Sequence, residues 1–160
     1  MSTATPPELC EHIVSVAKAR GALIAVAESV TGGLIAQQLT SVPGASQVFL
    51  AGVVAYSERM KCDLLGVDAV QMSHHGVVSE WTAAAMARGV LLATGASHAL
   101  ATTGVAGPGA ALGAAAGRVC LAVATADTLV TSSHDFAGNR DAVRAHAADA
   151  GLRALLDVLS

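Results

Sequence analysis

Apolar and polar residues along the chain follow two kinds of pattern, one typical of buried strands and one typical of amphipathic helices. Runs of strand length occur at 23–27, 48–56, 97–103, 119–125 and 129–136. The first three are separated by longer segments with apolar residues at helical spacing, which favours a sheet with helices on both faces. The last two are joined by three residues and predict a β-hairpin. We therefore expect an α/β fold: a three-layer α/β/α sandwich with a mixed sheet, in a single domain.

Turn and capping residues set the bounds of the expected helices. Pro7 suits the first turn of a helix, Gly21 suits its C-terminal cap, and Pro43-Gly44 ends the second helix. The helices are expected at 7–20, 34–42, 57–65, 68–72, 79–95 and 138–159. Residues 1–6 are expected to form a loose tail before a domain at 7–160, and His74-His75-Gly76 to form a loop.

One stretch, Ala27 to Ala36, changes abruptly from the strand pattern to the helix pattern. It contains Ser29 and Thr31, followed by Gly32 and Gly33. Such a turn lies at the carboxyl edge of the sheet, where open α/β sheets bind ligands, and the free N–H groups of the helix start favour an anion or a developing oxyanion. Ser29 therefore stands where a nucleophile would stand. Serine is also a common helix N-cap, and this stretch alone favours the capping interpretation.

Tyr56 and Lys61 follow the second expected strand, so both can face the same sheet edge as Ser29. A lysine can activate a serine hydroxyl without histidine if its amine loses the proton, and burial would lower its pKa. A change in that pKa from about 10.4 to about 7.5 costs roughly 4 kcal/mol. The chain has only two lysines, Lys18 and Lys61, which makes the second one a candidate base. A solvated surface lysine is the alternative, and the residues alone do not decide between them.

Two further segments carry candidate binding residues. The segment Thr103 to Gly109 follows a strand, and its glycines would let a ligand approach the backbone. It lacks the Gly-Lys-Ser/Thr ending of a nucleotide P-loop, and simple loop flexibility is the alternative. Arg140 stands in the first turn of a helix, where a cation is electrostatically misplaced. This suggests that it faces a carboxylate or phosphate, with a surface salt bridge as the alternative.

Composition narrows the classes of function. The 160 residues are 53% hydrophobic and 13% charged with a net charge of −3, which allows a packed core and gives no basic face for nucleic acid. No uninterrupted apolar run reaches transmembrane length and no secretory signal is visible, so we expect a soluble protein without membrane contact. The three widely spaced cysteines fit a reduced cytoplasm. The six histidines show no ligand spacing, so neither a metal nor a cofactor is expected, and the weakly charged, Ala-rich surface favours a homodimer.

Several motifs, in their order and spacing, resemble the C-terminal domain family of the competence-damage protein CinA, whose stand-alone members are nicotinamide-nucleotide amidases of the PncC type. The resemblance covers residues 8–159. The motifs that carry it are Ala27-Glu28-Ser29-Val30-Thr31-Gly32-Gly33, Gly52 through Tyr56-Ser57 with Lys61, Leu65-Gly66-Val67, His75-Gly76-Val77-Val78-Ser79-Glu80, Thr103-Gly104-Val105-Ala106-Gly107-Pro108 and Phe136-x-Gly138-Asn139-Arg140.

The resemblance implies hydrolysis of the carboxamide of nicotinamide mononucleotide to nicotinate mononucleotide and ammonia. It implies that Ser29 is the nucleophile, Lys61 the base and Tyr56 its helper, with N–H groups near Thr31 and Gly32 holding the oxyanion. The implied substrate-binding residues are Thr31, Gly32, Gly33, Thr103, Gly104, Gly107 and Arg140. Ser46, which follows the Pro-Gly turn, is kept as an alternative nucleophile or a substrate contact.

The loop after Pro108 departs from the family pattern. The family usually has an Asp-Gly-Gly run there and Lys-Pro-Val-Gly before the next strand, whereas residues 109–117 of this chain carry no charge. Two alternatives to the nucleotide amidase therefore stay open. One is a catalytically silent domain of the same fold that binds a nucleotide or a protein, and the other is an amidase for a different small amide.

Overall fold

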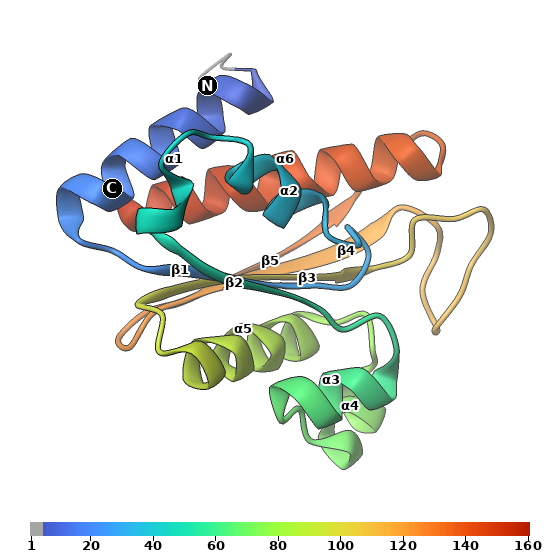
Figure 1. The fold of residues 1–160 in the computed structure, drawn as a ribbon. Helices are drawn as coiled ribbons and strands as arrows, with labels where there is room; N and C mark the ends of the chain where they lie inside the picture. Colours follow the sequence, from blue (N-terminus) through green and yellow to red (C-terminus); the bar gives the residue numbers. More distant parts are fainter. Residues whose placement is uncertain (1–4) are drawn as a thin grey trace.

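The computed structural model, which describes residues 5–160, has a mixed five-stranded sheet at its centre (Figure 1). The strand order is β2-β1-β3-β4-β5, with β1 parallel to both of its neighbours and β4 antiparallel to β3 and β5. The strands are β1 (Ile24–Glu28), β2 (Phe49–Val54), β3 (His98–Gly104), β4 (Arg118–Ala124) and β5 (Leu129–Asp135). The carboxyl ends of β1, β2 and β3 therefore lie at one edge of the sheet.

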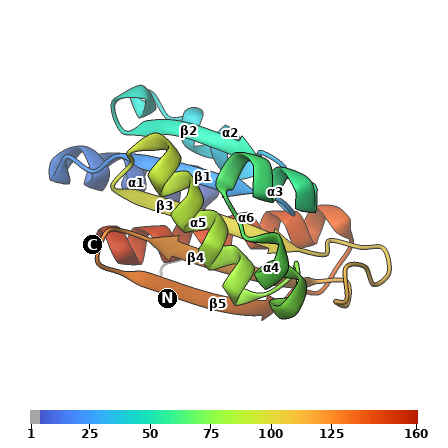
Figure 2. The same ribbon diagram turned by 90° about the horizontal axis from the view of Figure 1, so that it is seen from below.

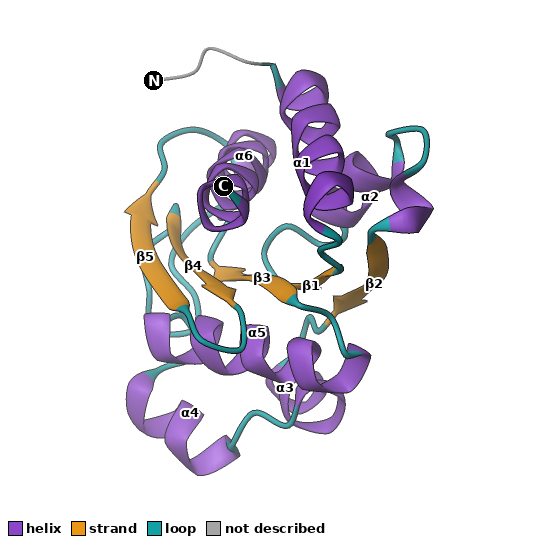
Figure 3. Ribbon diagram, turned by 90° about the vertical axis from the view of Figure 1, so that its left-hand side faces the viewer, coloured by secondary structure: helices purple, strands orange, loops and turns teal. Residues whose placement is uncertain are grey.

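Helices cover both faces of the sheet, which confirms the expected three-layer sandwich (Figure 3). One face carries α1 (Pro6–Arg20), α2 (Leu34–Thr40) and α6 (Arg140–Leu159), and a short 3₁₀ turn at Ala45–Gln47 follows α2. The other face carries α3 (Glu58–Leu65), α4 (Ala69–His75) and α5 (Glu80–Thr94). None of these helices, all within residues 5–160, is both long and apolar enough to cross a membrane.

The two apolar layers follow from the alternation of side chains along the strands. In β1, which is buried along its whole length, Ile24 and Val26 pack in the cluster under α1, α2 and α6, whereas Ala25 and Ala27 pack in the cluster under α5. Small residues let the second layer approach closely. A Cβ at Gly89 of α5 would lie 2.0 Å from the carbonyl oxygen of Leu65, so the end of α3 is fixed directly against α5.

The ends of some elements differ from the expectations. The first helix begins at Pro6, with Thr5 as its N-cap, and residues 1–4 of the expected tail lie outside the described residues. The loop expected at residues 74–76 is wrong, because α4 continues through His75 and Gly76 follows as its cap. The ring of His75 stacks on Trp81 at a centroid distance of 5.0 Å, and this tertiary contact holds the last turn of α4 in helical form.

Candidate active site

The turn between β1 and α2 presents Ser29 at the carboxyl edge of the sheet. The Ser29 amide donates to the carbonyl of Thr102 in β3, and the Ser29 carbonyl accepts from the Gly32 amide, so the backbone of the serine is fixed on both sides. Gly32 (φ 59°) and Gly33 (φ 96°) adopt the left-handed conformation that this sharp reversal requires. The Ser29 side chain is 7% exposed.

Glu28, the residue before the serine, has a role that sequence analysis missed. Its carboxylate is 1% exposed and accepts hydrogen bonds from the amides of Gly33, Ile35 and Ala36, at 3.0, 3.1 and 2.8 Å. A strand residue thus caps the start of α2. These amides and that of Gly32 are already bonded, so the expected oxyanion contact does not fall on Gly32 or the helix start, whereas the Thr31 amide has no protein acceptor within residues 5–160.

Lys61 reaches Ser29 from α3. Its Nζ lies 2.9 Å from Ser29 Oγ and 3.0 Å from the carbonyl oxygen of Ala55, and the side chain is 1% exposed. Burial lowers the pKa of Lys61 from its ordinary value of 10.5, while the nearby Glu58 carboxylate and Cys62 oppose that shift. The sequence left open whether Lys61 is a candidate base or a solvated surface lysine. In the structure it is a buried amine in hydrogen-bond contact with the Ser29 hydroxyl.

The start of α3 explains how the lysine comes to this position. Ala55, just after β2, donates its amide to the Glu28 carbonyl and so keeps the chain beside β1. Ser57 then caps α3 by accepting from the Met60 amide, and Glu58 stands in the first turn. Lys61 lies one turn into this helix, on the side that faces the sheet, because the helix is fixed at both ends.

A pocket of about 280 Å³ opens beside Ser29, close to the lower end of the range for small-molecule sites. Its walls come from the serine turn, from Tyr56, from the loop after β3 and from the start of α6. The lining residues are Ser29, Val30, Tyr56, Gly104, Val105, Ala106, Gly107, Pro108, Gly109, Ala111, Leu112 and Arg140. Arg140 is the one charged residue of this lining, and the 109–117 loop supplies apolar side chains.

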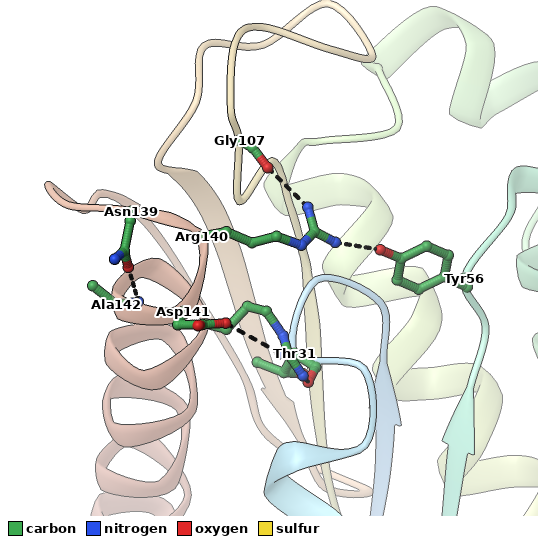
Figure 4. A network of polar contacts seen from close by, with 8 residues as sticks. Thr31, Tyr56, Gly107, Asn139, Arg140, Asp141 and Ala142 are labelled. Atoms are coloured by element: carbon green, nitrogen blue, oxygen red, sulfur yellow. Dashed lines mark hydrogen bonds and ion pairs between the residues drawn. The ribbon is translucent and has the colours of Figure 1, made fainter.

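Arg140 connects three walls of the pocket (Figure 4). Its guanidinium donates to the carbonyl of Gly107 at 2.9 Å and to the hydroxyl of Tyr56 at 2.7 Å. Asn139 caps α6 by accepting from the Ala142 amide, which places Arg140 at the first helical position. Tyr56 is 60% exposed, and its hydroxyl accepts a hydrogen bond from Arg140. Lys61 instead forms its hydrogen bonds with Ser29 and Ala55. The expected role of Tyr56 as a helper of Lys61 stays a prediction.

Thr31 lies behind the pocket and is fully buried. Its Oγ1 lies 2.8 Å from Oγ1 of Thr102, and its carbonyl accepts from the Arg144 guanidinium at 2.9 Å. Gly32 and Gly33 shape the turn but, like Thr31, are absent from the pocket lining. These residues hold the serine turn in place, and Arg144 and Thr102 are supporting residues that sequence analysis missed.

Two other expected site residues are directed elsewhere. Thr103 donates its hydroxyl to the carbonyl of Val77, away from the pocket, and the neighbouring Gly104 lines the pocket instead. Ser46 lies in the 3₁₀ turn before β2, in a separate cavity of about 450 Å³. It stands at the amino ends of the strands, whereas Ser29 stands at the carboxyl end of β1, whose five residues span about 16 Å. The structure therefore does not bring Ser46 into the pocket.

The fold and the site together define a single-domain α/β protein with a buried serine–lysine pair at the carboxyl edge of a mixed sheet. Among residues 5–160, no group of three or more His, Cys, Asp or Glu side chains could hold a metal ion. Residues 7–159 match the family model described as the CinA C-terminal domain. The chain belongs to this family.

Sequence relatives and solved structures agree with this assignment. CinA-like proteins from Frankia casuarinae and Chloroherpeton thalassium are 47% and 48% identical over 80% and 81% of the chain, and it spans 30% and 31% of their lengths. A CinA superfamily structure from Enterobacter cloacae matches with a TM-score of 0.96 at 30% identity, covering 100% of this chain and 95% of that one. The competence damage-inducible protein A from Klebsiella pneumoniae matches with a TM-score of 0.94 at 33% identity, covering 98% of both chains.

Proposed function

We propose that the protein is an amidase that hydrolyses the carboxamide of nicotinamide mononucleotide to nicotinate mononucleotide and ammonia. The observation that carries the proposal is the 2.9 Å contact between the buried Lys61 amine and the Ser29 hydroxyl at the wall of a pocket. A serine needs a neighbouring base to become a nucleophile, and a lysine with a lowered pKa can supply one. The substrate is taken from the family resemblance, and the reaction type from this pair.

The reaction proceeds through an acyl-enzyme. Ser29 Oγ attacks the amide carbon while its proton passes to the neutral amine of Lys61, whose lone pair is directed at the hydroxyl when an N–H is held by the Ala55 carbonyl. The Lys61 ammonium then returns the proton to the departing nitrogen, and ammonia leaves as the C–N bond breaks. Water, activated by the same amine, cleaves the ester to give the carboxylate and free Ser29.

Backbone amides at the serine turn and at the end of β3 remain for the oxyanion. Within residues 5–160 the Val30 amide has no protein acceptor, and Val30 lines the pocket. The amide of Val105 donates to Arg118 in β4, so by the alternation of antiparallel pairing the Gly104 amide points away from β4, toward the Ser29 side. Val30 and Gly104 are thus the donors we assign to the oxyanion, each contributing about 3 kcal/mol to the stabilisation of the transition state.

Arg140 is the residue we assign to the anionic group of the substrate. It is the one cation among the residues that line the pocket, and its planar guanidinium group can donate two parallel hydrogen bonds to a phosphate. In the present structure the guanidinium group donates to the Gly107 carbonyl and to the Tyr56 hydroxyl, so a phosphate would share or replace these contacts. Because the 109–117 loop adds no charge, the recognition of the phosphate depends on Arg140.

The test is ammonia release from nicotinamide mononucleotide by the purified protein. We expect Ser29→Ala and Lys61→Met each to lower kcat at least 1,000-fold. The chain offers a matched control for each, because Ser46→Ala removes a hydroxyl outside the pocket and Lys18→Met removes the other lysine. Both controls should keep activity within about twofold of the unmodified protein.

The outcomes separate the proposal from its alternatives. Ammonia release that survives both Ser29→Ala and Lys61→Met would exclude this mechanism. Binding of the nucleotide without any ammonia release would favour a catalytically silent domain. Release of ammonia from a smaller amide such as nicotinamide, but not from the nucleotide, would favour an amidase for a different substrate and would fit the uncharged 109–117 loop.

A further inference from the structure

The loop between β3 and β4 extends beyond the carboxyl edge of β3 (Figure 2). Its tip is a two-residue turn, in which Ala111 and Ala114 exchange both of their backbone hydrogen bonds at 3.0 and 2.9 Å. The two residues of the turn, Leu112 (φ 51°) and Gly113 (φ 74°), adopt the left-handed conformation. These are the features of a type I′ turn, whose central residues are typically asparagine and glycine. Leucine therefore stands at a position that favours asparagine.

Leu112 is strained, and packing in the core does not offset the strain. It is the one non-glycine residue with a positive φ within residues 5–160. The left-handed conformation brings a Cβ close to the backbone, which disfavours leucine relative to glycine or asparagine. The residue is 53% exposed and lies outside the apolar core clusters formed by residues 5–160. Strained residues of this kind gather at functional sites, so the structure points to a role for this side chain in binding.

Leu112 lines the pocket that opens beside Ser29, so its exposed surface is available to a ligand there. Arg140, the one charged residue of the lining, belongs to a different wall. When a carboxamide reaches Ser29 and an anionic group reaches Arg140, the part of the substrate between them meets the remaining walls. Those walls are largely apolar, and the other apolar residues that the loop contributes are Val105, Ala106, Pro108 and Ala111.

The base of the loop is fixed to the rest of the fold without help from Leu112. The Gly117 amide donates to the Val105 carbonyl at 2.7 Å, and the Arg140 guanidinium donates to the Gly107 carbonyl at 2.9 Å. The turn at the tip is closed by its own pair of backbone hydrogen bonds. Replacement of Leu112 should therefore change the surface of the pocket and leave its walls in place.

We propose that Leu112 is a substrate-binding residue that packs against the flat ring carrying the carboxamide. This role rests on the proposed function and deepens it, because it assigns the 109–117 loop to the ring of the nucleotide while Arg140 binds the phosphate. The apolar contact is the same before and during the attack by Ser29. Loss of such a contact raises KM and leaves kcat unchanged.

The test measures steady-state ammonia release and urea unfolding of Leu112→Asn. We expect KM for nicotinamide mononucleotide to rise about tenfold, kcat to stay within about twofold, and the urea midpoint to increase because asparagine relieves the strain. Leu112→Met restores an apolar side chain and should return KM to within about threefold of the unmodified protein. The matched control is Leu92→Asn, since Leu92 is 84% exposed on α5 and outside the pocket lining, and it should leave KM unchanged. Leu112→Gly replaces Leu112→Asn if the latter unfolds.

Calorimetric titration separates this contact from the reaction. Nicotinamide mononucleotide is titrated into Ser29→Ala and into Ser29→Ala combined with Leu112→Asn. Binding that is about tenfold weaker in the double variant supports the contact, even if the unmodified protein releases no ammonia and the proposed reaction fails. Equal affinities, or no binding to either protein, would overturn the role of Leu112. A lower urea midpoint in Leu112→Asn would overturn it as well, because the leucine would then stabilise the fold.

Discussion

Replacement of Glu28 by glutamine tests whether the serine turn depends on a buried carboxylate. The wild-type carboxylate accepts from three amides, two at one oxygen and one at the other. Glutamine retains one acceptor oxygen. If that oxygen accepts from the amides of Gly33 and Ile35, the new NH₂ group faces the N–H of Ala36. One charge-assisted hydrogen bond is then lost, and two donors are placed opposite each other. A hydrogen bond to a charged group contributes about 1.5–3 kcal/mol, so we expect Glu28→Gln to cost about 2–4 kcal/mol of unfolding free energy.

Urea unfolding followed by circular dichroism at neutral pH measures this cost. Glu28→Ala loses all three bonds and should cost more than Glu28→Gln. The control is Glu11→Gln, which makes the same chemical change at an exposed position of α1 and should stay within about 0.5 kcal/mol of the unmodified protein. The argument fails if Glu28→Gln is no more destabilising than Glu11→Gln. If it holds, the same variant should also lower kcat, because Ser29 is the next residue.

Three further predictions concern the pocket and its walls. Burial lowers the pKa of Lys61, so at every pH between the lowered value and 10.5 the unfolded chain binds a proton that the folded protein has released. In that window the unfolding free energy of the unmodified protein, measured with urea, should rise with pH relative to that of Lys61→Met, by at most about 1.4 kcal/mol per pH unit. A relative unfolding free energy that falls with pH would contradict the burial argument. Gly104→Ala should cost about 1–3 kcal/mol in the same assay, because the new Cβ would lie 2.7 Å from the Arg118 carbonyl oxygen, and no change in urea midpoint would mean that β3 and β4 can separate locally. Arg140→Lys should raise KM for the nucleotide at least tenfold while kcat changes less, since lysine cannot bond to Gly107 and Tyr56 at the same time. Steady-state kinetics of ammonia release measure both constants, and a loss confined to kcat would exclude this binding role.

Residue order along the chain was sufficient for the layers of the fold, and it made Ser29 and Lys61 candidates for one sheet edge without deciding their roles. The strand-to-helix change at residues 27–36 fixed the edge at which Ser29 lies, and the scarcity of lysine directed attention to Lys61. The same reasoning also excludes Ser46 once it is applied fully. In a parallel arrangement a residue that follows one strand and a residue that precedes the next strand lie at opposite edges of the sheet.

Side-chain direction within one strand could not be predicted in the same way. Thr102 and Thr103 are adjacent in β3, so they point to opposite faces, toward Thr31 and toward Val77 respectively. The choice between the two faces depends on the register of β3 with β1, which is a tertiary property. The capping role of Glu28 was hidden for a related reason, because acceptors for helix amides are usually sought at the N-cap itself and not in the preceding strand.

The capping by Glu28 changes how the electrostatics of the site must be understood. A helix start beside a serine would ordinarily attract anions, but here a carboxylate already occupies the amides of α2. The polar groups left to act on a reacting carbonyl are the Lys61 amine and isolated amides, while the one cation of the pocket lining, Arg140, belongs to a different wall. In the reaction that we propose, attack on the amide and recognition of an anionic group therefore rest on separate elements. Changes at Ser29 and Lys61 are for this reason expected in kcat, and changes at Arg140 in KM.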